Sequence, residues 1–89
     1  MKAIITVIGK DTTGIIAKIS AKCFEHGVNI LDITQKVLDD TFAMIMMINV
    51  TNLNIGFKEF IDIMNTLGVE NNLDIHTVNE DLFNSMHRI

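Results

Sequence analysis

The stretch that decides the fold is "AIITVIGKDTTGIIAKIS", residues 3–20. Residues 3–8 are apolar apart from Thr6 and rich in β-branched side chains, a pattern typical of a strand buried on both faces. Residues 9–14 contain two glycines, an acid and two threonines, which favour a turn. Isoleucines at helical spacing follow. The segment therefore predicts a strand, a tight turn and an amphipathic helix.

The helix that begins near Thr13 has one apolar side and one charged side. We place Ile16, Ile19 and Cys23 on its apolar stripe, with Ile15 and Phe24 flanking that stripe and Lys18, Lys22 and Glu25 opposite. His26 and Gly27 have the composition of a helix end.

The rest of the chain continues the alternation of strands and helices. The alternating run 28–38 predicts a half-exposed strand, with Leu31, Ile33, Gln35 and Val37 on one face; a hairpin turn at 39–40 and an apolar strand at 42–50 follow. Apolar residues three and four apart indicate a helix at 57–71. Residues 73–78 are expected to form a last strand. Residues 79–89 are expected to form a helix that is capped by Asn79 and has an apolar stripe of Leu82, Met86 and Ile89. This order, β-α-β-β-α-β plus a helix, predicts an α+β, ferredoxin-like sandwich: one domain over residues 1–89, with its core in 2–78.

Charge and cysteine content exclude several classes of function. The formal net charge of −4 disfavours nucleic acid and anionic membranes as partners. Cys23, the sole cysteine, is expected to be a core thiol, and the absence of a disulfide framework suits the cytoplasm. The three histidines, His26, His76 and His87, lack metal-ligand spacing, so we expect no metal and no cofactor.

The two inner strands are apolar on both faces, yet two helices cover only one face of such a sheet. We expect about five apolar side chains on the other face, from Ala3, Ile5 and Val7 with either Phe42, Met44 and Met46 or Ala43, Ile45 and Met47. A patch of that size needs a cover. The C-terminal helix, a second subunit or both would supply it, and we predict a homodimer.

The turn at residues 9–14 allows a structural and a binding interpretation. In the first, Asp11 or a threonine caps the helix and Gly14 allows close packing. In the second, the free N–H groups of the helix bind a carboxylate, Gly14 lets the backbone approach it, and Asp11 pairs with an ammonium group. A nucleoside-triphosphate loop is excluded because Ile15 and Ile16 stand where Lys and Ser/Thr are required.

Asn29 opens the second strand and offers a donor and an acceptor to a zwitterion. In this topology the second strand begins near the end of the first helix. If two subunits met along this strand, Asn29 of one would approach the turn of the other.

The segments "GKDTTGIIAKIS" and "EHGVNILDITQ" resemble the ACT domain family, in particular small stand-alone members related to the glycine-cleavage repressor and the first domain of formyltetrahydrofolate deformylase. The family pattern is D-R-P-G-I-V-A, then G-x-N-I-x-D-x-x-Q. The matching positions are Asp11, Gly14, Ile15, Ala17, Gly27, Asn29, Ile30, Asp32 and Gln35; the sequence departs at Thr12 and Thr13.

The resemblance implies a non-catalytic regulatory module that binds an amino acid at a subunit interface. It implies ligand-binding roles for Asp11, Gly14, Ile15, Asn29 and Ile30. An interaction module that docks on an enzyme or regulator without a ligand of its own is the alternative. No acid–base pair or nucleophile stands out, so an enzyme is not expected. RNA binding is disfavoured because exposed aromatic residues and a basic surface are missing.

Overall fold

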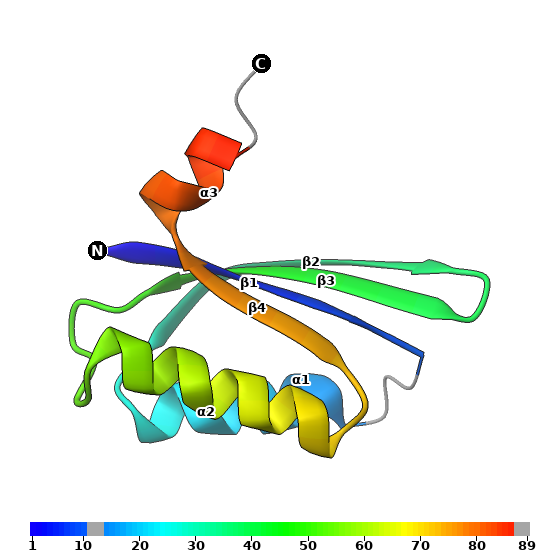
Figure 1. Ribbon diagram of the computed structural model, residues 1–89, viewed down its shortest axis with the longest axis horizontal. Coiled ribbons are helices and arrows are strands. Elements are labelled where there is room, and N and C mark those ends of the chain that lie inside the picture. Colours follow the sequence, from blue (N-terminus) through cyan, green and yellow to red (C-terminus); the bar gives the residue numbers. More distant parts are fainter. Residues whose placement is uncertain (11–13, 87–89) are drawn as a thin grey trace.

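The computed structural model describes residues 1–10 and 14–86. The strands form one antiparallel sheet in the order β2-β3-β1-β4. Helices α1 and α2 lie on one face of this sheet and α3 lies on the other (Figure 1). The elements are β1 (Lys2–Gly9), α1 (Ile15–Glu25), β2 (Asn29–Leu38), β3 (Thr41–Asn49), α2 (Phe57–Glu70), β4 (Asp74–Asn79) and α3 (Glu80–Met86). This architecture confirms the α+β, ferredoxin-like prediction, with β1 and β3 in the middle.

The core lies between the sheet and the pair α1 and α2. Ala3, Ile5 and Val7 of β1 are each 0% exposed, and Ile5 pairs with Met46 of β3. The expectation that Ala3, Ile5 and Val7 lie on the opposite face is therefore wrong. A continuously apolar strand carries no alternation that would indicate its phase. The face opposite the two long helices instead presents Ile4, Thr6, Ile8, Ala43, Ile45 and Met47.

A β-bulge in β2 breaks the alternation predicted for residues 28–38. Ile30 pairs with Ile48, and the register then shifts so that Asp32 pairs with Met47. Ile30 and Ile33 thus both pack against the core, although they are three residues apart. The extra residue, Leu31, is 42% exposed. An inserted residue of this kind leaves no local sequence signal in a strand of mixed polarity.

Helix α1 is rotated relative to the predicted stripe. Its buried residues are Ile15, Ile19 and Cys23, whereas Ile16 is 37% exposed. The rotation moves Ile16 from the core to the flank of the helix.

Gly68 of α2 allows the helix to approach β4 closely. A Cβ atom at this position would lie 2.8 Å from the Leu73 carbonyl oxygen and 3.1 Å from Cγ1 of Ile75. Residue 68 is buried inside the helix, and the cap is Asn71. The close contact between α2 and β4 therefore requires a glycine at this position.

Helix α3 begins at the predicted cap: the Leu82 N–H donates to Oδ1 of Asn79 at 2.7 Å. The predicted apolar stripe is only partly correct. Met86 lines a hollow against the sheet together with Phe83, although it is 59% exposed, and Leu82, 49% exposed, does not line that hollow. Ile89, like His87 and Arg88, lies outside the described residues.

Candidate functional site

A surface hollow of about 420 Å³ lies between the first turn of α1 and the adjoining ends of β2 and β3. Its lining residues are Ile16, Gln35, Lys36, Val37 and Phe42. Phe42 is buried at 4% exposure, whereas Val37 is 66% exposed. Phe42 pairs with Gly9 at the end of β1, so the hollow adjoins the strand end that leads into the turn.

The first turn of α1 presents backbone donors without intrahelical partners. In the part of the chain that the structure describes, the first hydrogen bond of the helix runs from the Lys18 N–H to the Gly14 carbonyl oxygen, at 3.0 Å. The N–H groups of Ile15, Ile16 and Ala17 precede it in the helix and have no carbonyl four residues back within the helix. These three groups and the positive end of the helix dipole suit a carboxylate.

Gly14 is required by its backbone conformation. Its φ of 74° and ψ of 2° lie in the left-handed region, where residues with a side chain are strained. Apart from its chain neighbours, no described residue has an atom within 4 Å of the position that a Cβ of Gly14 would occupy. Gly14 is the N-cap residue of α1, and because glycine has no side chain it cannot cap the helix with a side-chain hydrogen bond.

Two of the predicted site residues lie at this turn and two lie elsewhere in the chain. Gly14 and Ile15 begin α1, and the Ile15 side chain is in the core at 2% exposure. Asn29 and Ile30 follow the other end of α1, roughly 16 Å away for 11 residues at 1.5 Å each. The side chain of Ile30 packs against the core. Asp11 lies outside the described residues.

The sequence does not predict that Ile16, Gln35 and Val37 line a common hollow. Gln35 was visible in the G-x-N-I-x-D-x-x-Q match, but nothing in the sequence placed it beside the first turn of α1. The position follows from the hairpin, because β2 runs back along the sheet toward the start of α1 and ends at the hollow.

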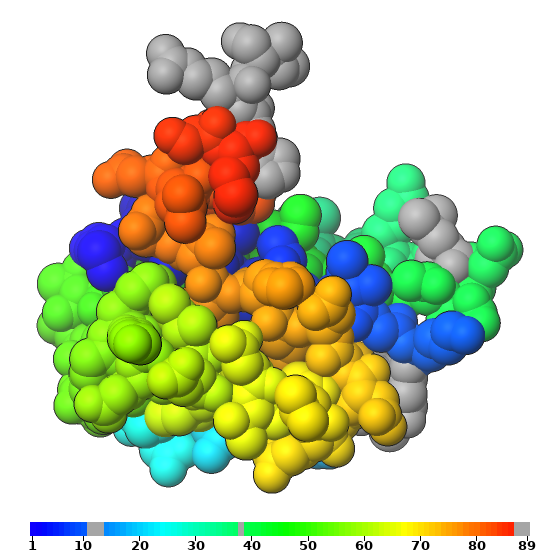
Figure 2. All heavy atoms as spheres, viewed as in Figure 1, coloured from blue at the N-terminus to red at the C-terminus, as the bar shows by residue number. Residues whose placement is uncertain are grey.

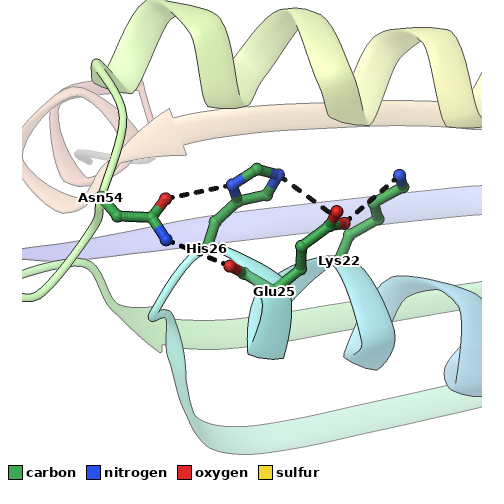
Figure 3. A network of polar contacts seen from close by, with 4 residues as sticks. All are labelled: Lys22, Glu25, His26 and Asn54. Carbon is green, nitrogen blue, oxygen red and sulfur yellow. Dashed lines mark hydrogen bonds and ion pairs between the residues drawn. The ribbon is translucent and has the colours of Figure 1, made fainter.

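A polar network fixes the other end of α1 (Figure 3). Nδ1 of His26 lies 3.1 Å from Oδ1 of Asn54, and Nδ2 of Asn54 donates to the backbone carbonyl oxygen of Glu25 at 3.1 Å. The Glu25 carboxylate lies 3.8 Å from Nε2 of His26 and 3.5 Å from Nζ of Lys22. The network joins α1 to the loop before α2, directly ahead of Asn29.

The outer edge of the molecule at α1 and β2 is apolar. Ile16, Ser20 and Phe24 are four residues apart and share one flank of α1, and Ile16 contacts the hollow beside β2. Phe24 is 88% exposed. We call the exposed set Ile16, Phe24, Leu31 and Val37 the α1–β2 edge. Because β2 is an edge strand, its outer backbone groups are also open to pairing.

A second hollow, of about 350 Å³, lies on the opposite face of the sheet beneath α3. Ile8 and Ile45, which line it, are 48% and 46% exposed. Figure 2 shows the surface recessed between α3 and the β2–β3 hairpin. Helix α3 thus covers this face only in part.

Groups suited to catalysis are not assembled in the described residues. Cys23 is 1% exposed, and burial raises the pKa of its thiol from 9.0 to about 11, so it is protonated at neutral pH and confirms the expectation of a core thiol. The Asp74–His76 contact of 2.9 Å is exposed on β4. Within 1–10 and 14–86, no three side chains of His, Cys, Asp or Glu gather as metal ligands, and no helix has the length and apolarity to cross a bilayer.

The model of the ACT domain family matches residues 2–78, and the chain belongs to this family. A UPF0237 protein of Clostridium perfringens is 44% identical over 89 residues, the full length of both chains. The solved structure of an ACT domain protein from Streptococcus pneumoniae is 38% identical, with a TM-score of 0.81 over 93% of each chain. ACT domains are in general regulatory, ligand-binding modules.

Two further structures share the fold at lower identity. A formyltetrahydrofolate deformylase from Pseudomonas syringae is 20% identical with a TM-score of 0.78, over 89% of this chain and 28% of that one. A putative glycine cleavage system transcriptional repressor is 22% identical with a TM-score of 0.67, over 85% of this chain and 43% of that one. The resemblance predicted from the turn and the second strand is confirmed.

Proposed function

We propose that this chain is a non-catalytic regulatory module that binds an amino acid or a similar small zwitterion where two copies meet. The hollow beside the first turn of α1 carries the proposal, because it brings an amide side chain and apolar walls next to a helix N-terminus at the edge of the molecule. A zwitterion with a short side chain has matching groups.

The predicted residues take complementary roles in this arrangement. The ligand's carboxylate accepts from the first-turn N–H groups, which Gly14 leaves accessible and to which Ile15 contributes through its backbone. Its ammonium group pairs with Asp11. Ile30 acts from the core by fixing the start of β2, which sets the position of Asn29.

The second copy pairs along β2. Antiparallel pairing of two β2 strands about their middle would bring Asn29 of the partner subunit opposite the last residue of β2, next to Val37 of the hollow. The α1–β2 edge supports this choice of junction, since its four large apolar side chains lie on the surface that pairing would cover. The site is therefore complete only in the homodimer.

We place the module in the cytoplasm, because its single cysteine is free and cytoplasmic proteins rarely contain disulfides. Residues 1–89 act as one unit in this proposal, with 2–78 as the ACT core.

The alternative is an interaction module that docks on an enzyme or regulator. The partly covered sheet face at Ile8 and Ile45 favours it, because an exposed apolar face is a surface for protein partners. In that case the turn before α1 is structural only.

Calorimetric titration with the common amino acids at millimolar concentration tests the proposal. We expect at least one to bind, and Asp11→Ala and Asn29→Ala to weaken it by about tenfold, the effect of one lost charge-assisted or amide hydrogen bond. Asn65→Ala on the exposed surface of α2 is the matched control and should bind normally. If no amino acid binds the folded dimer, the zwitterion proposal is wrong and the interaction module stands.

A further inference from the structure

We infer that the ligand's side chain is apolar, as in valine, leucine or isoleucine. This inference rests on the proposed function and concerns which zwitterion the site selects. It follows from the composition and arrangement of the walls of the hollow.

Three of the five lining residues present hydrocarbon to the space. Phe42 is nearly fully buried and forms the floor, and Val37, its register partner across β2 and β3, rises beside it. Ile16 stands opposite on α1. Contact with such walls favours a ligand side chain in proportion to the apolar area that it removes from water.

Ile16 connects the two parts of the site. Its backbone N–H belongs to the first turn of α1, and its side chain lines the hollow. A carboxylate held on the first-turn donors therefore carries its own side chain toward Val37 and Phe42. The free volume of about 420 Å³ admits a side chain of three or four carbons.

The apolar lining disfavours charged side chains. A cationic or an anionic side chain would lose hydration against Phe42 and Val37. The Gln35 amide oxygen is an acceptor for the ligand's ammonium group, which leaves the apolar walls for the side chain.

A binding panel tests the inference by calorimetry on the wild-type protein. Its probes are L-valine, L-leucine, L-isoleucine, glycine, L-serine, L-aspartate and L-lysine. We expect the branched apolar set to bind at least about tenfold more tightly than glycine or serine, the discrimination typical of a hydrophobic pocket, and the two charged amino acids to bind more weakly still.

Val37→Thr, which keeps the shape of the exposed wall residue, should reduce the affinity for L-leucine by roughly three- to tenfold more than the affinity for glycine. Val69→Thr, on the exposed surface of α2, is the control and should change neither.

The outcomes separate this inference from the proposed function. Equal or tighter binding of glycine, serine or a charged amino acid overturns the inference and leaves the proposed function standing. An unchanged preference in Val37→Thr overturns it also. If no amino acid binds, the proposed function fails and the inference fails with it.

Discussion

His26 and Asn54 join two turns that are 28 residues apart in the sequence. Their side chains meet at 3.1 Å between Nδ1 and Oδ1, and the Asn54 N–H donates to the His26 carbonyl oxygen at 3.1 Å. Since β2 begins three residues after His26, this contact fixes where the edge strand starts. It sets the position of Asn29 relative to the rest of the sheet.

Asn54→Ala removes the side-chain hydrogen bonds to His26 and to the Glu25 carbonyl oxygen. We expect the free energy of unfolding to fall by about 1–2 kcal/mol, the net worth of two partly exposed hydrogen bonds. Urea denaturation measures it. Asn52→Ala, two residues earlier in the same loop, is the control and should change it by less than about 0.5 kcal/mol. Equal effects of the two substitutions would mean that the network contributes no stability.

Phe24→Lys tests the α1–β2 edge. Phe24 is 88% exposed in the last turn of α1, so a lysine is accommodated without loss of folding and favours the helix end. We expect light scattering to report a dimer for the wild type and a monomer for this variant. Val69→Lys, 79% exposed in the last turn of α2, is the matched control and should remain dimeric. A wild-type monomer, or a dimer that survives Phe24→Lys, contradicts the proposed junction.

Thr77→Val should stabilise the protein. Thr77 is 5% exposed, and its Oγ1 atom has no hydrogen-bond partner among the described residues. Valine has the same shape and removes the cost of an unpaired buried hydroxyl, so the free energy of unfolding should rise by about 1 kcal/mol. Chemical denaturation measures the gain. Thr34→Val, on the exposed part of β2, should change stability little; a loss of stability in Thr77→Val would contradict the account.

Cys23 makes stability depend on pH above 9. Burial raises the pKa of its thiol from 9.0 to about 11 in the folded protein, so the unfolded chain loses the proton first as the pH rises. The thiol's contribution is complete below pH 9 and declines by roughly 2–3 kcal/mol through pH 11. The difference in unfolding free energy between wild type and Cys23→Ala should fall over this window. A constant difference would show that the thiol is not desolvated.

The sequence predicts the order of elements because hydrophobic periodicity changes clearly between strands and helices. It predicts a buried Cys23 and the Asn79 cap for the same local reasons. It does not predict which face of β1 is buried, since "AIITVI" is apolar at nearly every position and pairing with β3 decides the phase. The bulge at Leu31 and the 37% exposure of Ile16 also arise from packing between elements rather than from local pattern.

In the candidate site, too, some features follow from the local sequence and others only from packing between elements. Gly14 could be singled out because a glycine between a strand and a helix is a local signal. Gln35 and Val37 could not be placed beside it, because their proximity depends on the length of the hairpin and on the register of β2 against β3.

The most direct test of the central claim is an amide chemical-shift titration of the labelled protein with L-leucine. We predict that the signals of Gly14, Ile15, Ile16 and Val37 move together and saturate, while that of Thr77 beneath α2 stays in place. Shifts confined to Ile8, Ile45 and Phe83, or no shifts with any amino acid, would contradict a zwitterion site at the first turn of α1.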